Sequence, residues 1–258
     1  MLFFHRRTKG TITWWVCAIF LLAASVPGYA QVLEGKDTLF QVSTVTGLEH
    51  GIFYPVTTVG ELKQHGNVGV GAFEGMDGEL ILIDGQPFNA MYDGEVVPVD
   101  DKTPITYSAV AFLNANRTVP LQNVASYEQL QQSIEKLLPN RNIFYVFKIY
   151  GAFNYLKVRS TAKQEKPYPG IAQVVKNQSV FEFTNVKGTL VGVRCPAYLQ
   201  GVYAPGFHLH FISDDLQKGG HLIEVNLAEG TGEIGYLTQM HLLLPDNDRT
   251  RAVDLAVK

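Results

Sequence analysis

Residues 142–160 read Asn142-Ile-Phe-Tyr-Val-Phe-Lys-Ile-Tyr150, then Gly151-Ala-Phe, then Asn154-Tyr-Leu-Lys-Val-Arg-Ser160. The first run is rich in aromatic and β-branched residues, which favours a buried strand. The last run alternates apolar and polar side chains, which is typical of a strand with one face in solvent. Because Gly151 separates the two runs, we expect them to form an antiparallel hairpin that turns at this glycine.

The same strand character recurs on both sides of this region. Strands are predicted in seven further segments: 39–45, 67–73, 79–84, 186–193, 206–212, 221–225 and 231–244. Short turn sequences lie between several of them, namely Met76-Asp-Gly78, Asp84-Gly85 and Asp93-Gly94. Such turns join neighbouring antiparallel strands, so the first half of the chain is expected to form an antiparallel meander.

Helix signals are few. Thr58 with Glu61 fits a capping box, and Gly66 ends the short helix that it predicts. Ser126 with Gln129 fits a second capping box, and Pro139-Asn140 ends the helix that it predicts. The apolar face of this helix consists of Leu130, Ile134, Leu137 and Leu138. The expected fold class is α+β: mostly antiparallel β-sheet in two closely packed lobes, with few short helices.

Residues 1–30 differ from the rest of the chain. A basic start is followed by the apolar run 12–26 and by Gly28-Tyr-Ala30, which has small residues where a signal peptidase reads the chain. This pattern predicts a signal peptide cleaved after Ala30, and hence an exported protein, periplasmic or secreted. A retained membrane anchor is the alternative, but the apolar run is short for a spanning helix. We therefore divide the chain into residues 1–30 and one domain, residues 31–258.

Composition limits the partners of that domain. The chain has 258 residues, of which 46% are hydrophobic and 17% charged, enough apolar content for a large core. Loss of Arg6, Arg7 and Lys9 with the signal leaves 18 basic and 24 acidic residues, a net charge of -6. An acidic domain without basic clusters is not expected to bind nucleic acid, or a membrane once the signal is removed. Cys195 is the one cysteine left, so no intrachain disulfide is expected.

The sequence Gly206-Phe-His208-Leu-His210-Phe-Ile212 contains candidate metal ligands. Residues two apart on a strand point to the same face, so His208 and His210 are expected side by side. After a polar loop, Gly219-Gly220 allows a tight return that would bring His221 to the same face. Three converging imidazoles are typical of a zinc site with one open coordination position, and manganese, iron or nickel also bind such ligands.

A structural interpretation of these histidines competes with the metal site. A pair of histidines two residues apart also occurs on ordinary sheet surfaces, and only the third histidine beyond the glycine turn favours a ligand set. The remaining histidines of the domain have no second histidine at a ligand spacing in the sequence, and we interpret them as structural or exposed: His50, His65 and His241.

At this point the chain resembles the alpha-acetolactate decarboxylase family. The Gly-Phe-His-Leu-His-Phe-Ile segment with its trailing Gly-Gly-His is similar to that family's metal motif. Further similar segments occur in the family's order: 41–48, 69–80, 138–145, 158–168, 188–192 and 196–198. Together they extend from about residue 39 to Pro245 and are far more specific than the histidine pair alone.

The resemblance implies roles for residues that composition does not single out. Asp-Gly-Glu-Leu at 77–80 places Glu79 at the family's active-site glutamate, and Arg159 matches the arginine that faces the substrate. The family also carries a second active-site glutamate in a C-terminal tail. Residues 246–258 contain no convincing match; Asp254 is the nearest acidic residue and is not assigned.

The activity that the resemblance implies is metal-dependent decarboxylation of 2-acetolactate (2-hydroxy-2-methyl-3-oxobutanoate) to acetoin and CO2, through a metal-stabilised enediolate. It makes residues 31–258 a catalytic domain for small 2-hydroxy-3-oxo acids. The residues alone leave two other classes open: an exported three-histidine enzyme of cupin-like or hydrolytic type, and a non-catalytic metal-binding β-protein. The oligomeric state also stays open, with a homodimer as one option.

Overall fold

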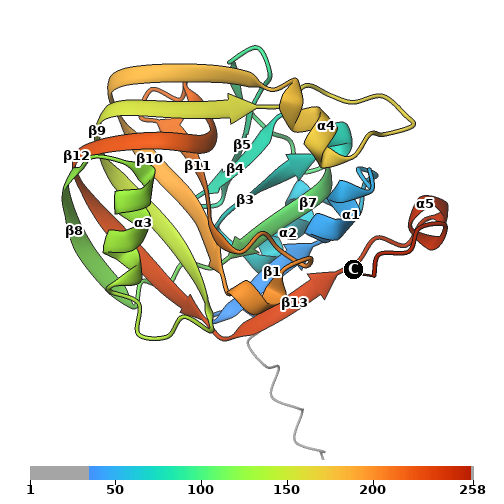
Figure 1. Cartoon of the computed structure of the whole chain (residues 1–258), viewed down its shortest axis with the longest axis horizontal. Helices are drawn as coiled ribbons and strands as arrows, with labels where there is room; N and C mark the ends of the chain where they lie inside the picture. The colour runs from blue at the N-terminus through green and yellow to red at the C-terminus, as the bar shows by residue number, and fades with distance from the viewer. Residues whose placement is uncertain (1–34, 257–258) are drawn as a thin grey trace, which may run out of the picture. The chain divides into compact units, whose positions relative to one another are not determined.

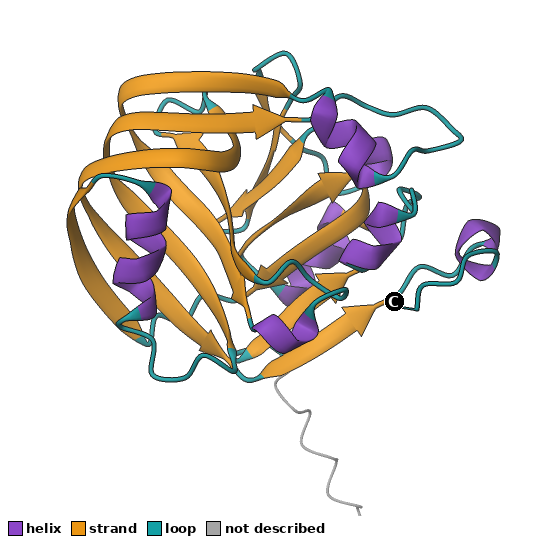
Figure 2. Cartoon of the chain, in the orientation of Figure 1, coloured by secondary structure: helices purple, strands orange, loops and turns teal. Residues whose placement is uncertain are grey.

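The computed structural model describes residues 35–256, so the predicted signal peptide lies outside the described residues (Figure 1). Within this range the chain is built mainly from strands, with short helices between them (Figure 2). Among these residues, no helix has the length and apolar character needed to cross a membrane.

The described strands form two sheets, and the expected antiparallel β-rich fold with few short helices is confirmed. The first sheet has the order β13-β1-β7-β3-β4-β5-β6, with β2 paired to β7. Its strands are β1 (Thr38–Val42), β2 (Thr57–Thr58), β3 (Val68–Phe73), β4 (Glu79–Ile83), β5 (Gln86–Ala90), β6 (Val96–Pro98), β7 (Pro104–Ala111) and β13 (Gln239–Leu243).

The meander expected in the first half exists as β3 to β6, where each strand pairs with the next. The turn at Asp84-Gly85 joins β4 to β5, and both residues have positive φ angles, 49° and 76°. The first sheet has two features that the patterns did not predict. Strand β7 returns to pair with β3, and the late strand β13 lies parallel to β1.

The second sheet consists of longer strands in the order β11-β10-β9-β12-β8, and β11 also pairs with β12. Its strands are β8 (Arg117–Val124), β9 (Phe144–Ser160), β10 (Ser179–Cys195), β11 (Gly206–Ser213) and β12 (Gly219–Leu237). In Figure 1, β9, β10 and β12 curl round together at one side of the molecule.

The hairpin predicted at Gly151 is wrong, because β9 runs without a break from Phe144 to Ser160. Gly151 pairs with Gly188 on one side and with Gly230 on the other, so three glycines cross the sheet in one row. A Cβ atom on Gly151 would lie 2.6 Å from the carbonyl oxygen of Glu229. A glycine inside a strand often marks a sharp bend or a close backbone approach, and here it does so without reversing the chain.

The helices are short and lie between or beside the sheets. They are α1 (Val45–Glu49), α2 (Val59–His65), α3 (Tyr127–Glu135), α4 (Ile171–Lys176) and α5 (Asp248–Arg251), with 3-10 turns η1 (Glu74–Met76) and η2 (Ala197–Leu199). The two predicted helices are confirmed as α2 and α3, with N-caps Thr58 and Ser126. Leu130 and Ile134 form the buried face of α3.

The two sheets pack through a shared apolar core, which gives the two lobes their contact. Buried Val70 of β3 and Ile81 of β4 belong to the same cluster as Val146, Val193 and Ile212 of the second sheet. Ile212 lies two residues beyond His210 on β11, so these histidines face the first sheet.

Candidate metal centre

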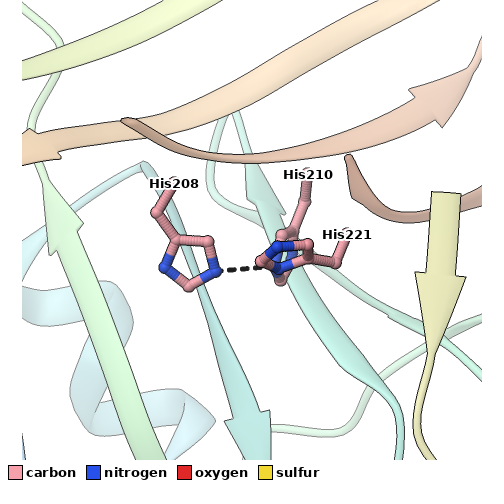
Figure 3. A group of neighbouring side chains, drawn as sticks. All are labelled: His208, His210 and His221. Carbon is pink, nitrogen blue, oxygen red and sulfur yellow. Dashed lines mark hydrogen bonds between the residues drawn. The ribbon is translucent and has the colours of Figure 1, made fainter. Parts of the chain in front are cut away.

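The three predicted ligand residues come together at the β11–β12 hairpin. His210 and His221 are direct cross-strand partners, and His208 lies two residues along β11 on the same face. Gly219 and Gly220 begin β12 and are buried, with Gly220 at φ 144°. The expected return of the chain after the polar loop is confirmed, and the three rings face one another (Figure 3).

The nitrogen atoms of the three rings lie within coordination range of one ion. His208 Nε2 is 3.1 Å from His210 Nε2, which is 3.3 Å from His221 Nδ1. Two nitrogens held about 2.0–2.1 Å from a tetrahedral zinc ion are about 3.3–3.4 Å apart. One nitrogen from each ring lies within 4.8 Å of those of the other two, so the donor set fits a divalent ion.

Burial keeps these imidazoles neutral, as ligands must be. His210 is fully buried, and His208 and His221 are partly buried. Loss of solvent lowers the pKa of His208 to about 3, with a smaller contribution from the charge of Arg159. The pKa values of His210 and His221 are also lowered, again mainly by burial. A neutral imidazole has a lone pair to offer a metal, whereas imidazolium has none.

A backbone carbonyl of the first sheet holds His210. Its Nδ1 lies 2.8 Å from the carbonyl oxygen of Leu80 in β4. A carbonyl accepts only, so Nδ1 carries the proton and donates it, which leaves Nε2 as the bare nitrogen facing the cluster. This type of outer contact orients ligand histidines in metal sites.

Glu79 and Arg159 lie beside the histidines. Glu79 is the first residue of β4, with a side chain only 5% exposed, and one carboxylate oxygen is 3.5 Å from His210 Nε2. Its other oxygen accepts a hydrogen bond from Arg159 Nη1 at 3.1 Å. Arg159 near the end of β9 is the cross-strand partner of His221. All five residues singled out from the sequence therefore lie in one place.

The environment of Glu79 changes its acidity. The pKa of Glu79 is raised from 4.5 to about 7 because the group is buried. The positive charge of Arg159 opposes this rise and is the smaller effect. A carboxyl group with a pKa near neutrality exchanges its proton readily at physiological pH. Such a group, buried next to a candidate metal site, has the properties of a proton carrier.

The turn before Glu79 is held by the strand end that carries Arg159. Gly75, Met76 and Gly78 all have positive φ angles, between 60° and 85°. Thr161 clamps this turn twice: its hydroxyl donates to the Met76 carbonyl at 2.8 Å, and its own carbonyl accepts from the Gly78 N–H at 3.0 Å. The positions of Glu79 and Arg159 are thus fixed together.

One contact of the cluster was not predicted from the sequence. The hydroxyl of Tyr203, a fully buried residue between η2 and β11, lies 2.7 Å from His208 Nδ1. Tyr203 stands five residues before His208 in a segment without strand periodicity, so no pattern pointed to it. Asp254, the acidic residue of the C-terminal segment that was left unassigned, is exposed and accepts a hydrogen bond from the Ala256 N–H.

A shielded cluster of neutral imidazoles beside a carboxyl group and an arginine is typical of metal-dependent enzymes that act on anionic substrates. The chain belongs to the alpha-acetolactate decarboxylase family, whose model matches residues 39–257. This confirms the resemblance found in the sequence and the assignment to the lyases.

Individual members of this family are similar to the chain over most of its length. Alpha-acetolactate decarboxylase from Methanosarcina mazei is 39% identical over 82% of this chain and 74% of its own length. The enzyme from Bacillus subtilis strain 168 is 35% identical over 81% of this chain and 82% of its own. A crystal structure of that enzyme superposes with a TM-score of 0.82, 34% identity, and coverage of 84% of this chain and 93% of the other.

Proposed function

We propose that this protein decarboxylates 2-acetolactate to acetoin and CO2. The observation that carries the proposal is the position of the Glu79 carboxyl group, which lies between Arg159 and the three histidines. The family gives the substrate class, and the geometry gives each residue a task. His208, His210 and His221 would hold the metal, and Arg159 and Glu79 would act on the substrate.

Arg159 is suited to orient the substrate carboxylate. The guanidinium presents several N–H donors in a fixed plane that matches a carboxylate, and one terminal nitrogen already binds Glu79. An arginine that bound the carboxylate too strongly would stabilise the ground state and slow the loss of CO2. Because Glu79 shares this guanidinium, Arg159 positions the carboxylate without holding it at full strength.

Glu79 is suited to carry the proton that the reaction consumes. Loss of CO2 leaves an electron pair that moves onto the neighbouring ketone, and acetoin forms when a proton is then added to carbon. A carboxyl group with a pKa of about 7 delivers that proton and regains one from solvent. Because Glu79 is fixed on one side of the histidine cluster, it protonates one face and yields one acetoin enantiomer.

We propose zinc as the metal, because three histidines are a common zinc ligand set. When bound, a divalent ion supplies Lewis-acid stabilisation of the negative charge that develops as CO2 leaves. Manganese, iron and nickel are the other candidates for the same donors. Metal analysis of protein purified without added metal separates them.

The experiment that tests the function is an acetoin assay on the purified protein, with and without a chelator. We expect acetoin and CO2 in equal amounts, loss of activity with chelator and recovery with zinc. His210→Gln should lose metal and activity together. Activity that persists in metal-free protein would contradict the proposal, and an acid with an alcohol or amine as products would indicate a hydrolase.

We also propose that the protein is exported and cleaved after Ala30. The support is the basic start, the apolar run and the small residues before Gln31. N-terminal sequencing of protein recovered outside the cytoplasm should begin at Gln31. An intact N-terminus on the active protein would contradict cleavage.

A further inference from the structure

Tyr203 makes a contact with the cluster that differs in kind from the one made by Leu80. A phenol hydroxyl both donates and accepts hydrogen bonds, whereas a backbone carbonyl only accepts. The carbonyl of Leu80 therefore fixes the proton of His210 on Nδ1, while Tyr203 is compatible with either tautomer of His208.

The two tautomers of His208 have different uses. If Tyr203 donates to Nδ1, the His208 proton sits on Nε2 and points at the bare Nε2 of His210, 3.1 Å away. If Tyr203 accepts from Nδ1–H, then His208 Nε2 carries a lone pair and is ready to bind a metal. The first arrangement satisfies a cluster without metal, because three lone pairs at this separation would repel one another.

Two other groups would donate to the same lone pair of His210 if they carried a proton. His221 Nδ1 is 3.3 Å from His210 Nε2, and a Glu79 oxygen is 3.5 Å from it. His208 Nε2 is the closest of the three. A hydrogen bond from the Tyr203 hydroxyl to His208 Nδ1 would also favour the tautomer that carries its proton on Nε2.

Tyr203 is held rigidly enough for this task. Its N–H donates to the Leu199 carbonyl at 3.1 Å, and the carbonyl of the preceding Val202 accepts from the Val45 N–H at 3.0 Å. Its ring stacks on Tyr107 with centroids 5.9 Å apart. The hydroxyl is therefore fixed beside His208, and only its hydrogen has to rotate.

We propose that Tyr203 is a positioning residue that switches the tautomer of His208, as a donor when the site lacks metal and as an acceptor when metal is bound. His210 already has a bare Nε2 that can bind a metal, whereas His208 has to move its proton from Nε2 to Nδ1 when the metal binds. The inference rests on the metal site of the proposed function and concerns metal affinity and proton position.

The test compares Tyr203→Phe with Tyr107→Phe, a buried tyrosine whose ring stacks on that of Tyr203. Zinc dissociation constants are measured by competition with a chromophoric chelator. Loss of an outer partner of a ligand histidine typically weakens metal binding by about 10–100-fold, so we expect this for Tyr203→Phe. Tyr107→Phe should stay within about threefold of the parent. Equal zinc affinity in the parent and Tyr203→Phe would overturn the role.

A second measurement uses the unaltered protein and does not depend on the variants folding. Two-bond 1H–15N correlation spectra distinguish the tautomers of a histidine ring. We expect His208 as the Nε2–H form in metal-free protein and as the Nδ1–H form after zinc is added. The Nδ1–H form in both states would overturn the switch. Failure of the parent to bind zinc would remove the metal site and this role with it, whereas zinc binding without acetoin formation would contradict only the proposed function.

Discussion

Replacing Glu79 with glutamine removes the titrating oxygen while keeping the size of the side chain. The amide oxygen still accepts from Arg159 Nη1, now 3.1 Å from the carboxylate, so the arginine stays in place. A positioned acid–base group contributes roughly 10²–10⁴-fold to a rate. At about 1.36 kcal/mol for each factor of ten, Glu79→Gln should raise the barrier by about 3–5 kcal/mol.

The measurement is steady-state acetoin formation together with zinc content. We expect kcat to fall by that factor and zinc to stay bound by the three histidines. KM should not rise, because Arg159 remains and no longer shares its charge with a carboxylate. Asp77→Asn is the matched control: this carboxylate lies two residues away, is 38% exposed and pairs with Lys163. The control should keep parental turnover. Glu79→Gln with full zinc and a kcat within about threefold of the parent would refute the role of Glu79.

Three further predictions concern stability and reactivity. Because burial raises the pKa of Glu79 from 4.5 to about 7, folded metal-free protein keeps a proton that the unfolded chain has lost in this range. The stability due to this proton is complete below about pH 4.5 and falls by about 1.36 kcal/mol per pH unit between pH 4.5 and 7. The total loss is about 3 kcal/mol, and it levels off above pH 7. Urea unfolding at pH 4.5 and pH 8 should show most of that change in the difference between the parent and Glu79→Gln; a constant difference would contradict it. A Cβ atom on Gly192 would lie 2.0 Å from the His208 carbonyl oxygen, so Gly192→Ala should cost about 3 kcal/mol and weaken zinc binding; an unchanged melting temperature would count against the β10–β11 packing. Cys195 is 1% exposed and burial raises its pKa to about 12, so the protein cleaved after Ala30, in which it is the single cysteine, should react with a thiol reagent at pH 8 only after unfolding; rapid reaction in the native state would be the contrary result.

Local patterns predicted which segments form strands better than how those strands pair. The runs around residues 142–160 are both extended, as expected, but Gly151 looks the same locally in a turn and in a bend. What decides between them is the pairing with Gly188 and Gly230, which are far away in the sequence. The parallel pairing of β13 with β1 is nonlocal in the same way.

The site could be predicted where chemistry follows a short spacing. His208 and His210 share a face because strands have a period of two, and the Gly219-Gly220 turn returns His221 to them. Glu79 and Arg159 came only from the resemblance, since their proximity depends on how two sheets pack. Tyr203 lies in irregular chain, where no periodicity relates it to His208.

The cluster depends on both sheets. The histidines belong to β11 and β12, but the carbonyl that orients His210 and the carboxyl beside it come from β4 of the other sheet. A metal held by this cluster would therefore favour the packed arrangement over any state in which the sheets separate. Because a ligand that binds only the folded form adds about 4 kcal/mol at a thousand times its dissociation constant, zinc should raise the melting temperature of the parent protein. The rise should shrink in any variant that loosens contact between β4 and β11, even when all three histidines remain. Full stabilisation by zinc in such a variant would show that the hairpin alone builds the site.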